Sequence, residues 1–433
     1  MPGPRPPSVL FVNQHYWPDV ASTGQHLTDL AEHCAARGFD VSVLCGRGKY
    51  LAGDLEAPKE EVRNGVRIRR LATTSFGRGS NLGRIADYAG YYLGVLRRLL
   101  TGPSYDLVVV LTTPPLLSYA ASVMRRVRKR PYAVWSMDLH PDAEVALGML
   151  DAGSFPARRL EALNRTGYRN ADLVVDLGFV MKERIAAKGV ELHKLETIEV
   201  WSDGEEVFPV PAASNPVREE LGLGEDRFVV MYSGNAGLAH RFDEVLGAMR
   251  RLKDDDRFFF LFVGGGPRKA EVERFIEAEG IENALYRGYF PREQLAQSLS
   301  AGDVHLLTLR EDMAGIAVPG KLYGVMAAGR PVVMVGPERS EPARTIREHG
   351  VGVVVDPNDG EGGTPTDRLV DALLTMADNA ALRRETGTRA RSVFETVYDR
   401  PILCEKWAQT LAGRLDVRLQ GSTESNPSEK AAI

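Results

Sequence analysis

Short apolar runs alternate with helix-length amphipathic segments along most of this chain, and this alternation restricts the fold more than any other feature. Helical patterns separate the later runs of the first half, as βαβ units require. The alternation predicts a parallel sheet that is covered by helices on both faces. The strands predicted in the first half are residues 9–12, 41–45, 66–71, 107–111, 132–137 and 173–176.

The alternation stops at residues 198–216, where prolines and small polar residues indicate a linker between domains. It then resumes, and a chain of 433 residues exceeds the length at which single cores stop growing. We therefore expect two doubly wound α/β domains, residues 1–205 and 206–389, with a disordered tail at 418–433. The strands predicted in the second half are 228–232, 258–263, 284–287, 304–309 and 353–355, with helices at 241–252, 268–279 and 292–300.

Composition excludes several classes of protein. The net charge of −4 gives no reason to expect a nucleic-acid partner. Cys34, Cys45 and Cys404 lie far apart and lack metal-ligand spacing, so we expect reduced thiols in a cytoplasmic protein, and no metal site. We also expect no signal peptide, and no apolar run reaches the roughly 18 residues of a spanning helix. The protein is expected to be soluble, or at most bound to a membrane surface.

The stretch REDMAGIAVPGKLYGVMAAGRPVVMV, residues 310–335, is predicted to form a loop, a helix and a strand. Pro319 suits the first position of a helix, because its fixed φ is helical and its missing N–H is no loss there. Leu322 and Val325 recur at helical spacing, and Gly329 ends the turn. The free N–H groups at such a helix start, with Lys321 on its first turn, suit an anion such as a diphosphate.

Ligands of open parallel sheets bind beyond the carboxyl ends of the strands, and glycine and polar residues gather in the loops at those ends. A single glycine there is more often an ordinary turn residue, but seven such loops on matching edges of two halves are harder to dismiss. A nicotinamide-dependent dehydrogenase is disfavoured, because G-x-G-x-x-G does not follow the first strand and no carboxylate ends the second. The seven loops are 13–24, 112–115, 138–142, 233–241, 264–267, 288–291 and 310–320.

Seven motifs occur in order along the chain: STG at 22–24, TTPP at 112–115, WSMDLHPD at 135–142, EVALG at 144–148, MYSGNAGL at 231–238, FVGGGP at 262–267 and PGKLYGVMAAGRPV at 319–332. Together they resemble the retaining glycosyltransferases of the GT-B fold, specifically family four and its bacterial colanic-acid and O-antigen-type members. The last motif is the most specific. The resemblance covers nearly the whole chain except the tail.

The resemblance implies two Rossmann-like domains that face each other across a cleft, with a C-terminal helix, residues 390–417, crossing back to the first domain. The second domain would bind a nucleoside-diphosphate sugar, with a UDP-sugar favoured, and the first would bind the acceptor. No separate cofactor is implied. The donor-binding residues would be Gly24, Gly234, Asn235, His240, Arg241, Gly265, Tyr289, Phe290, Gly320, Lys321, Leu322 and Tyr323, with the base against Tyr289 and Phe290.

This sequence departs from the family pattern in the donor site. Many relatives hold the ribose with the second glutamate of E-x-x-x-x-x-x-x-E, but Gly324 occupies that position and Ile316 the first. Glu311 or Asp312 could replace the first glutamate. The usual arginine and lysine of the diphosphate turn fall near Asn235 and His240. Lys321 and Arg241 are therefore the best remaining cations for the charge that develops on the leaving group.

The catalytic residues implied by the resemblance are Asp138, His140 and Lys321. A histidine of many relatives falls near Asp138, and His140 follows two residues later. Asp138 or His140 could orient the acceptor or the sugar, or Asp138 could simply cap the following turn. His15 is a further candidate. The departing diphosphate can take the acceptor proton, so little general-base help and no metal are expected.

Residues 81–100 form an amphipathic helical pattern, and RRVRKR at 125–130 adds positive charge nearby. The pair could meet anionic lipid and a lipid-linked acceptor, or it could be a core-packing helix beside a solvated basic helix end. The predicted apolar face consists of Leu82, Ile85, Ala89, Tyr92, Leu96 and Leu99, with Arg97 and Arg98 near the end.

The function expected is transfer of a hexosyl or N-acetylhexosaminyl group, with retention of configuration, to a lipid-linked or saccharide acceptor. The setting would be cell-surface polysaccharide or glycolipid assembly, in the cytoplasm or on the inner face of the plasma membrane. A sugar-nucleotide epimerase of the same fold shares donor recognition. A non-catalytic nucleotide-sugar-binding protein is the third interpretation, suggested by the missing ribose glutamate.

Overall fold

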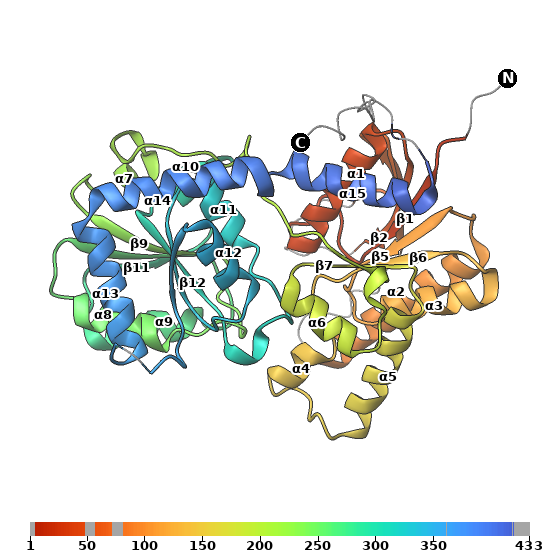
Figure 1. Cartoon of the computed structure of the whole chain (residues 1–433), viewed down its shortest axis with the longest axis horizontal. Helices are drawn as coiled ribbons and strands as arrows, with labels where there is room; N and C mark the ends of the chain where they lie inside the picture. Colours follow the sequence, from red (N-terminus) through yellow and green to blue (C-terminus); the bar gives the residue numbers. More distant parts are fainter. Residues whose placement is uncertain (1–4, 48–56, 72–80, 361, 418, 420–433) are drawn as a thin grey trace, which may run out of the picture.

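The computed structural model describes residues 5–47, 57–71, 81–360, 362–417 and 419, without the side chains of 81–87. Two α/β domains lie next to each other (Figure 1). The N-terminal sheet has the strand order β3-β4-β2-β1-β5-β6-β7-β8, and only its β3–β4 pair is antiparallel. Its strands are β1 Ser8–Val12, β2 Asp40–Gly46, β3 Glu60–Arg63, β4 Val66–Leu71, β5 Leu107–Val110, β6 Tyr132–Trp135, β7 Leu173–Asp176 and β8 Leu195–Thr197.

The C-terminal sheet is parallel throughout, with the strand order β11-β10-β9-β12-β13-β14. Its strands are almost entirely apolar because both faces are buried by helices. The predicted α/β architecture is therefore confirmed. The strands are β9 Phe228–Ser233, β10 Phe258–Val263, β11 Ala284–Arg287, β12 Val304–Thr308, β13 Val332–Val335 and β14 Gly352–Val355.

Helices follow most strands in both domains. Those of the first are α1 Ser22–Ala36, α2 Asn81–Thr101, α3 Leu117–Arg128, α4 Asp142–Ala146, α5 Phe155–Arg169 and α6 Phe179–Ala187. Those that follow are α7 Pro216–Glu220, α8 Asp243–Leu252, α9 Lys269–Glu279, α10 Leu295–Ser300, α11 Lys321–Ala327, α12 Glu341–His349, α13 Pro365–Asp378, α14 Ala380–Val393 and α15 Arg400–Leu415. The predicted helix start at Pro319 is wrong by two residues, because Gly320 is the N-cap of α11.

The last two helices span both domains (Figure 1). Helix α14 contacts α11 of the second domain, and α15 contacts α1 of the first. Glu405 on α15 accepts hydrogen bonds from His33 and Arg37 at the end of α1. Trp407 packs on Trp135 at a ring separation of 4.7 Å. The chain therefore returns to its first domain, as the resemblance implies.

The apolar face predicted for residues 81–100 is partly correct: Leu99 is buried, and Tyr92 and Leu96 are half-buried and pack against the core. Tyr91, Val95 and Leu99 are the buried residues of α2, whereas Ala89 is exposed. Leu82 and Ile85 lie outside the described side chains. The packed face is set by contact with α3, which single-helix periodicity does not include.

Within the described residues, no helix is both long and apolar enough to cross a membrane. The same residues contain no group of three or more histidine, cysteine, aspartate or glutamate side chains suited to a metal ion. Cys34, Cys45 and Cys404 are buried free thiols.

Candidate active site

The loops at the carboxyl ends of the two sheets meet. The loop after β12 reaches the loop after β6, where Asp138 and Ala317 form an isolated antiparallel bridge. The Leu139 N–H donates to the Ile316 carbonyl at 2.9 Å. Arg310 donates to the Ala146 carbonyl at 3.1 Å. These contacts bring together two loops that were predicted to bind ligand, 138–142 of the first half and 310–320 of the second.

Lys321, the first residue of α11, lies against Tyr232 near the end of β9. Its Nζ donates to Tyr232 Oη at 2.7 Å and lies 4.0 Å from the centre of the ring. Tyr232 Oη in turn donates to the Asn235 carbonyl at 3.0 Å. Burial lowers the pKa of Lys321 to about 7. Among the described residues, no carboxylate pairs with Lys321, so an incoming anion would be the group that favours its protonated form.

Glycine backbone lies directly beside this ammonium group. Gly234 has φ +123°, and a Cβ atom there would lie 3.5 Å from Lys321 Nζ. A Cβ atom at Gly264 would lie 2.2 Å from the Gly234 carbonyl oxygen. Gly265 accepts a hydrogen bond from the Ala236 N–H at 2.7 Å. The two glycine loops therefore pack backbone to backbone, which only residues without a side chain allow.

His240 faces the same cluster but carries no positive charge. Its Nδ1 lies 2.6 Å from the Thr308 carbonyl, so the Nδ1–H tautomer donates there. Burial, together with the charges of Lys321 and Arg268, lowers its pKa to about 3. Its ring packs edge-on against Tyr232. His240 can therefore supply a neutral polar group, but it cannot replace a cation.

Arg241 does not offer a free charge to this cluster. Its guanidinium binds Glu244 through Nε at 2.9 Å and through a second nitrogen. The chain therefore brings together Lys321, Gly234, Asn235 and His240, whereas Arg241 pairs with Glu244 in the first turn of α8. Sequence reasoning missed Tyr232, because its place in an apolar strand gave no sign that its hydroxyl reaches Lys321.

The two aromatic residues predicted to meet the base differ in position. Tyr289 is 62% exposed, and its ring lies over the glycine loop, 3.3 Å from a Cβ atom built on Gly264 and 3.7 Å from one on Gly265. Phe290 instead lies under the Arg287 guanidinium at 3.6 Å. Tyr289 is therefore the aromatic residue beside the glycines.

Four of the residues predicted to bind the donor pack against other parts of the protein. Leu322 and Tyr323 are buried in the core, and Tyr323 packs on Tyr398 with ring centres 4.7 Å apart. A Cβ atom at Gly320 would meet Val200 at 3.3 Å. A Cβ atom at Gly24 would lie 3.2 Å from the backbone carbonyl carbon of His15. These four residues can offer only backbone groups to a ligand.

The position of the missing ribose glutamate is not crowded. A Cβ atom at Gly324 would lie 3.5 Å from Leu299 and 3.9 Å from Ser202, which are ordinary contact distances. Glu311 accepts a hydrogen bond from Asn358, and Asp312 pairs with Arg310. Both suggested substitutes for the first glutamate therefore have partners already.

Asp138 and His140 lie on the opposite side of the contact between domains. His140 Nδ1 lies 2.7 Å from Glu144 Oε1. Burial acts to lower the His140 pKa, but the Glu144 hydrogen bond and the charges of Glu144 and Asp138 outweigh it and raise the pKa. Burial raises the pKa of Asp138. Asp138 does not cap α4, whose N-cap is Pro141.

Glu144 is a second residue that sequence reasoning missed, although its i,i+4 spacing from His140 was a visible signal. His15, the further candidate, pairs with Asp19 at 3.1 Å within its own loop. The arrangement thus places the His140–Glu144 pair on one side of the contact between the domains and Lys321, which has no carboxylate partner among the described residues, on the other.

Comparisons with known proteins agree with this architecture. Residues 23–201 match a family model described as a glycosyl transferase 4-like domain, and residues 214–393 match one described as glycosyl transferases group 1. The probable glycosyltransferase WbjE of Pseudomonas aeruginosa is 30% identical over 303 residues, which cover 70% of this chain and 73% of that protein. The putative colanic acid biosynthesis glycosyl transferase WcaI of Escherichia coli K12 is 23% identical over 94% of this chain and 100% of its own length.

Solved structures share the whole fold. Sucrose-phosphate synthase from Thermosynechococcus elongatus has a TM-score of 0.73 at 16% identity, covering 95% of this chain and 99% of its own. Anabaena HepE in complex with UDP and glucose has a TM-score of 0.69 at 17% identity, covering 94% and 99%. At these identities the likeness concerns the fold alone.

Proposed function

This chain belongs to the group 1 glycosyltransferases of the GT-B fold, and we propose that it transfers a sugar from a nucleoside-diphosphate sugar to an acceptor with retention of configuration. The acceptor oxygen would form its bond to the anomeric carbon on the face from which the diphosphate departs. The acceptor proton would pass to an oxygen of that diphosphate. The name of the relative WcaI supports a setting in cell-surface polysaccharide assembly.

One observation carries this proposal: the ammonium group of Lys321 lacks a carboxylate partner among the described residues and lies beside the bare backbone of Gly234. Negative charge develops on the departing diphosphate, so a preorganised cation at this place favours the transition state over the ground state. Neutral His240 and the exposed Tyr289 would contact the rest of the nucleotide. We assign donor binding to residues 206–389 and acceptor binding to residues 1–205.

We favour a UDP-sugar as the donor, and a hexosyl or N-acetylhexosaminyl group as the sugar. HepE, with the same fold, has been solved with UDP-glucose. A relative of 29% identity is named a GDP-mannose-dependent phosphatidylinositol monomannoside mannosyltransferase. A GDP-sugar is therefore the alternative donor to compare with a UDP-sugar. The phosphatidylinositol monomannoside in that name also supports a lipid-linked acceptor.

The experiment is a thermal-shift screen with UDP, GDP and their sugars, followed by release of the nucleoside diphosphate and NMR of the product anomer. A bound nucleotide raises the unfolding temperature by mass action. Lys321→Met should abolish the shift, whereas Lys59→Met, at an exposed lysine of the first domain, should not. Inversion at the anomeric carbon would contradict the proposal.

The same screen tests the alternatives. Interconversion of the sugar with the nucleotide still attached would identify an epimerase. Binding without turnover, with every acceptor tried, would leave a nucleotide-sugar-binding protein.

A further inference from the structure

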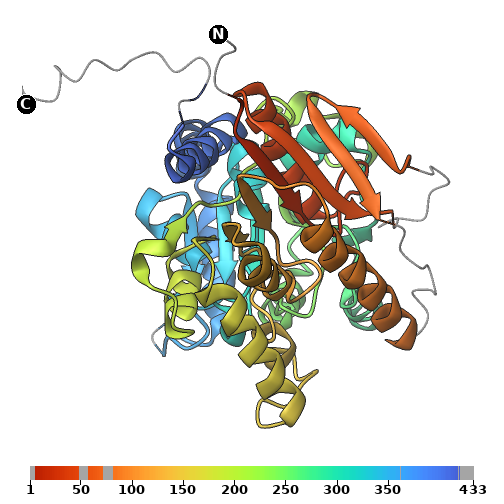
Figure 2. The same ribbon diagram turned by 90° about the vertical axis from the view of Figure 1, so that its right-hand side faces the viewer.

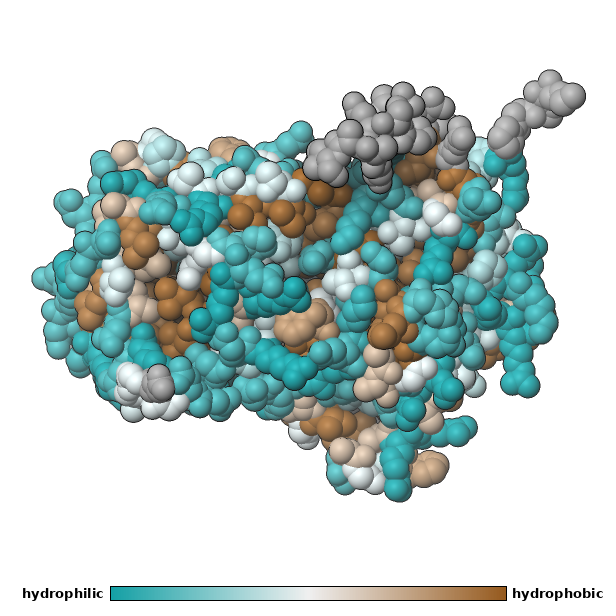
Figure 3. All heavy atoms as spheres, viewed as in Figure 1, coloured by the Kyte–Doolittle hydropathy of each residue, from teal (hydrophilic) through white to brown (hydrophobic). Residues whose placement is uncertain are grey.

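The segment between α4 and α5 projects from the N-terminal domain (Figures 1 and 2). We call residues 147–156 the apolar tip, because Phe155 and Met149 are 74% and 63% exposed there. Among the described residues, Phe155 is the most exposed of the large hydrophobic side chains. Brown and pale spheres appear on this projection in Figure 3. Such side chains at the end of a projection are available to a partner.

The apolar tip is held firmly at its base. The N–H groups of Met149 and Leu150 both donate to the Glu144 carbonyl, at 2.8 and 3.1 Å. Ser154 caps α5 by accepting a hydrogen bond from Ala157. Beneath the tip, the buried Lys188 binds Asp142 at 2.6 Å and Glu161 at 2.8 Å. The exposed apolar side chains are therefore displayed by an ordered turn.

Positive charge lies next to the exposed aromatic ring. Arg158 and Arg159 follow Phe155 within one turn of α5, and both are exposed. Within the described part of the chain, neither has a carboxylate partner. Asp151 is the one acidic residue between 147 and 159, and its Oδ1 accepts a hydrogen bond from Gly153. Apolar side chains flanked by free arginines complement a surface of anionic lipid.

Two arginines of the basic segment 125–130 are engaged within the domain. Arg125 pairs with Asp172. Arg128 donates to the carbonyls of Leu99 and Gly102 at 3.0 and 2.8 Å. The segment's other three cations are exposed, but Val127 is the one large exposed hydrophobic side chain among them in the described part of the chain. The apolar tip displays two such side chains, so it is the better candidate for insertion into a membrane surface.

Glu144 connects the tip to the candidate active site. Its carboxylate pairs with His140, and its carbonyl accepts the two N–H groups of the tip. The five residues of α4 span only ~7.5 Å. One short helix therefore connects the apolar tip to the His140–Glu144 pair.

We propose that the apolar tip inserts Phe155 and Met149 into the interface of an anionic lipid bilayer, with Arg158 and Arg159 at the phosphate level. The membrane contact would present the head group of a lipid-linked acceptor beside His140. Only this last step rests on the proposed glycosyltransferase function.

The test is flotation of the full chain with vesicles of equal parts phosphatidylglycerol and phosphatidylcholine, and with vesicles of phosphatidylcholine alone. The double variant Met149→Ser/Phe155→Ser should bind mixed vesicles about ten-fold or more weakly, since each removed side chain contributes apolar transfer free energy. Val62→Ser/Leu192→Ser is the matched control, because those side chains are 70% and 68% exposed outside the tip. Arg158→Gln/Arg159→Gln should reduce binding to the mixed vesicles. This variant should bind mixed vesicles no more tightly than vesicles of phosphatidylcholine alone.

Equal losses in the tip and control variants would overturn the proposal, as would a wild-type chain that fails to float. Light scattering that shows a dimer lost only in the tip variant would assign the surface to a second copy instead. A nucleotide-binding assay distinguishes the two proposals. If the chain binds no nucleotide but still floats with vesicles in a way that depends on the apolar tip, only the proposed donor site is contradicted.

Discussion

At Lys321 the side chain's charge depends on what binds beside it. The ammonium donates to a neutral phenol, and the charged and titratable groups around it are Tyr232, His240, His305 and Arg268. All of these groups are neutral or positive near pH 7. An incoming diphosphate would thus supply the missing counter-charge.

Donor affinity should therefore depend on pH. The free enzyme has a Lys321 pKa of about 7, and a bound diphosphate favours the protonated form. Above pH 7 binding must take up a proton, so affinity should fall up to about ten-fold per pH unit. Calorimetry of the selected nucleotide sugar in buffers of different ionisation enthalpy measures that uptake. Lys321→Arg should bind without the pH dependence, since arginine stays charged; a flat profile for the wild type would refute this charge assignment.

His140 makes a separate prediction. His140→Gln removes the imidazole that pairs with Glu144 while leaving the donor cluster unchanged. We expect turnover to fall about 100-fold, as when a group that positions the reactants is lost, with an unchanged donor Kd. Steady-state kinetics and calorimetry distinguish the two effects. A parallel loss of donor binding would show that His140 has a structural role instead.

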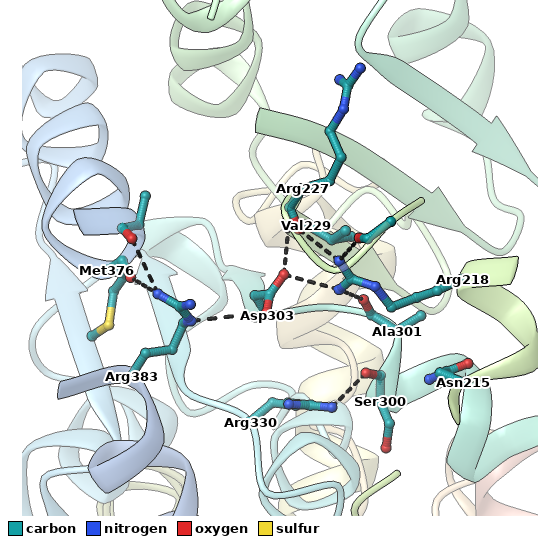
Figure 4. A network of polar contacts seen from close by, with 12 residues as sticks. Asn215, Arg218, Arg227, Val229, Ser300, Ala301, Asp303, Arg330, Met376 and Arg383 are labelled. Atoms are coloured by element: carbon teal, nitrogen blue, oxygen red, sulfur yellow. Dashed lines mark hydrogen bonds and ion pairs between the residues drawn. The ribbon is translucent and has the colours of Figure 1, made fainter. Parts of the chain in front are cut away.

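At the scale of elements, Asp303 joins four parts of the C-terminal domain (Figure 4). At the start of β12 it accepts hydrogen bonds from the Val229 N–H at 2.8 Å and from Arg218 at 3.1 Å, and Arg383 lies 3.9 Å away. Arg218 and Arg330 also donate to the carbonyls of Ala301 and Ser300, at the end of α10. The cluster lies at the amino end of β12, away from the candidate active site.

Asp303→Ala should lower the free energy of unfolding by about 3–5 kcal/mol, because it leaves buried guanidinium groups without their carboxylate. Urea denaturation measures the change. Asp226→Ala, at an exposed aspartate of the same domain, is the control and should have little effect. Equal stabilities of the two variants would mean that the carbonyl contacts alone hold the arginines.

Two elements show where sequence patterns were insufficient. Strand β3 was not predicted, because its residues are exposed or half-buried at a sheet edge and lack an apolar pattern. Asn64 and Gly65, both at positive φ, form an Asn-Gly turn that could have predicted the β3–β4 hairpin. In α2 the periodicity predicted the helix and placed Leu99 correctly on its packed face, but it missed the buried Tyr91 and Val95. The face was fixed by α3, which packs against it.

At the scale of the whole molecule, the two domains are joined by polar contacts as well as apolar ones. Glu341 of α12 accepts a hydrogen bond from the Phe179 N–H, the first of α6, at 2.8 Å. Arg184 donates to the Ala314 carbonyl at 2.8 Å. Burial raises the pKa of Glu341 to about 7, and that of the nearby Asp176 also to about 7.

These two carboxyl groups should stabilise the contact between the domains most strongly at acidic pH. A raised folded-state pKa contributes full stability below the unfolded value, 4.5 for Glu341, and that stability is lost as pH rises through about 7. Glu341→Gln mimics the protonated group, so its Tm should match the wild type near pH 4.5 and exceed it at pH 8. Glu225→Gln, at an exposed position, is the control. A Tm difference that stays constant with pH would contradict the expectation.

Local patterns in the sequence determined the two α/β halves, the family and Lys321 as a candidate phosphate ligand. These features depend on periodicity and turn chemistry within about ten residues, which a sequence displays directly. Contacts between distant residues decided the rest. Lys321 meets Tyr232, and Asp138 meets Ala317, only because strand order brings separate loops to one place. The exposure of Phe155 likewise follows from how helices pack, whereas the i,i+3 pairing of Arg241 with Glu244 is local and could have been read from the sequence.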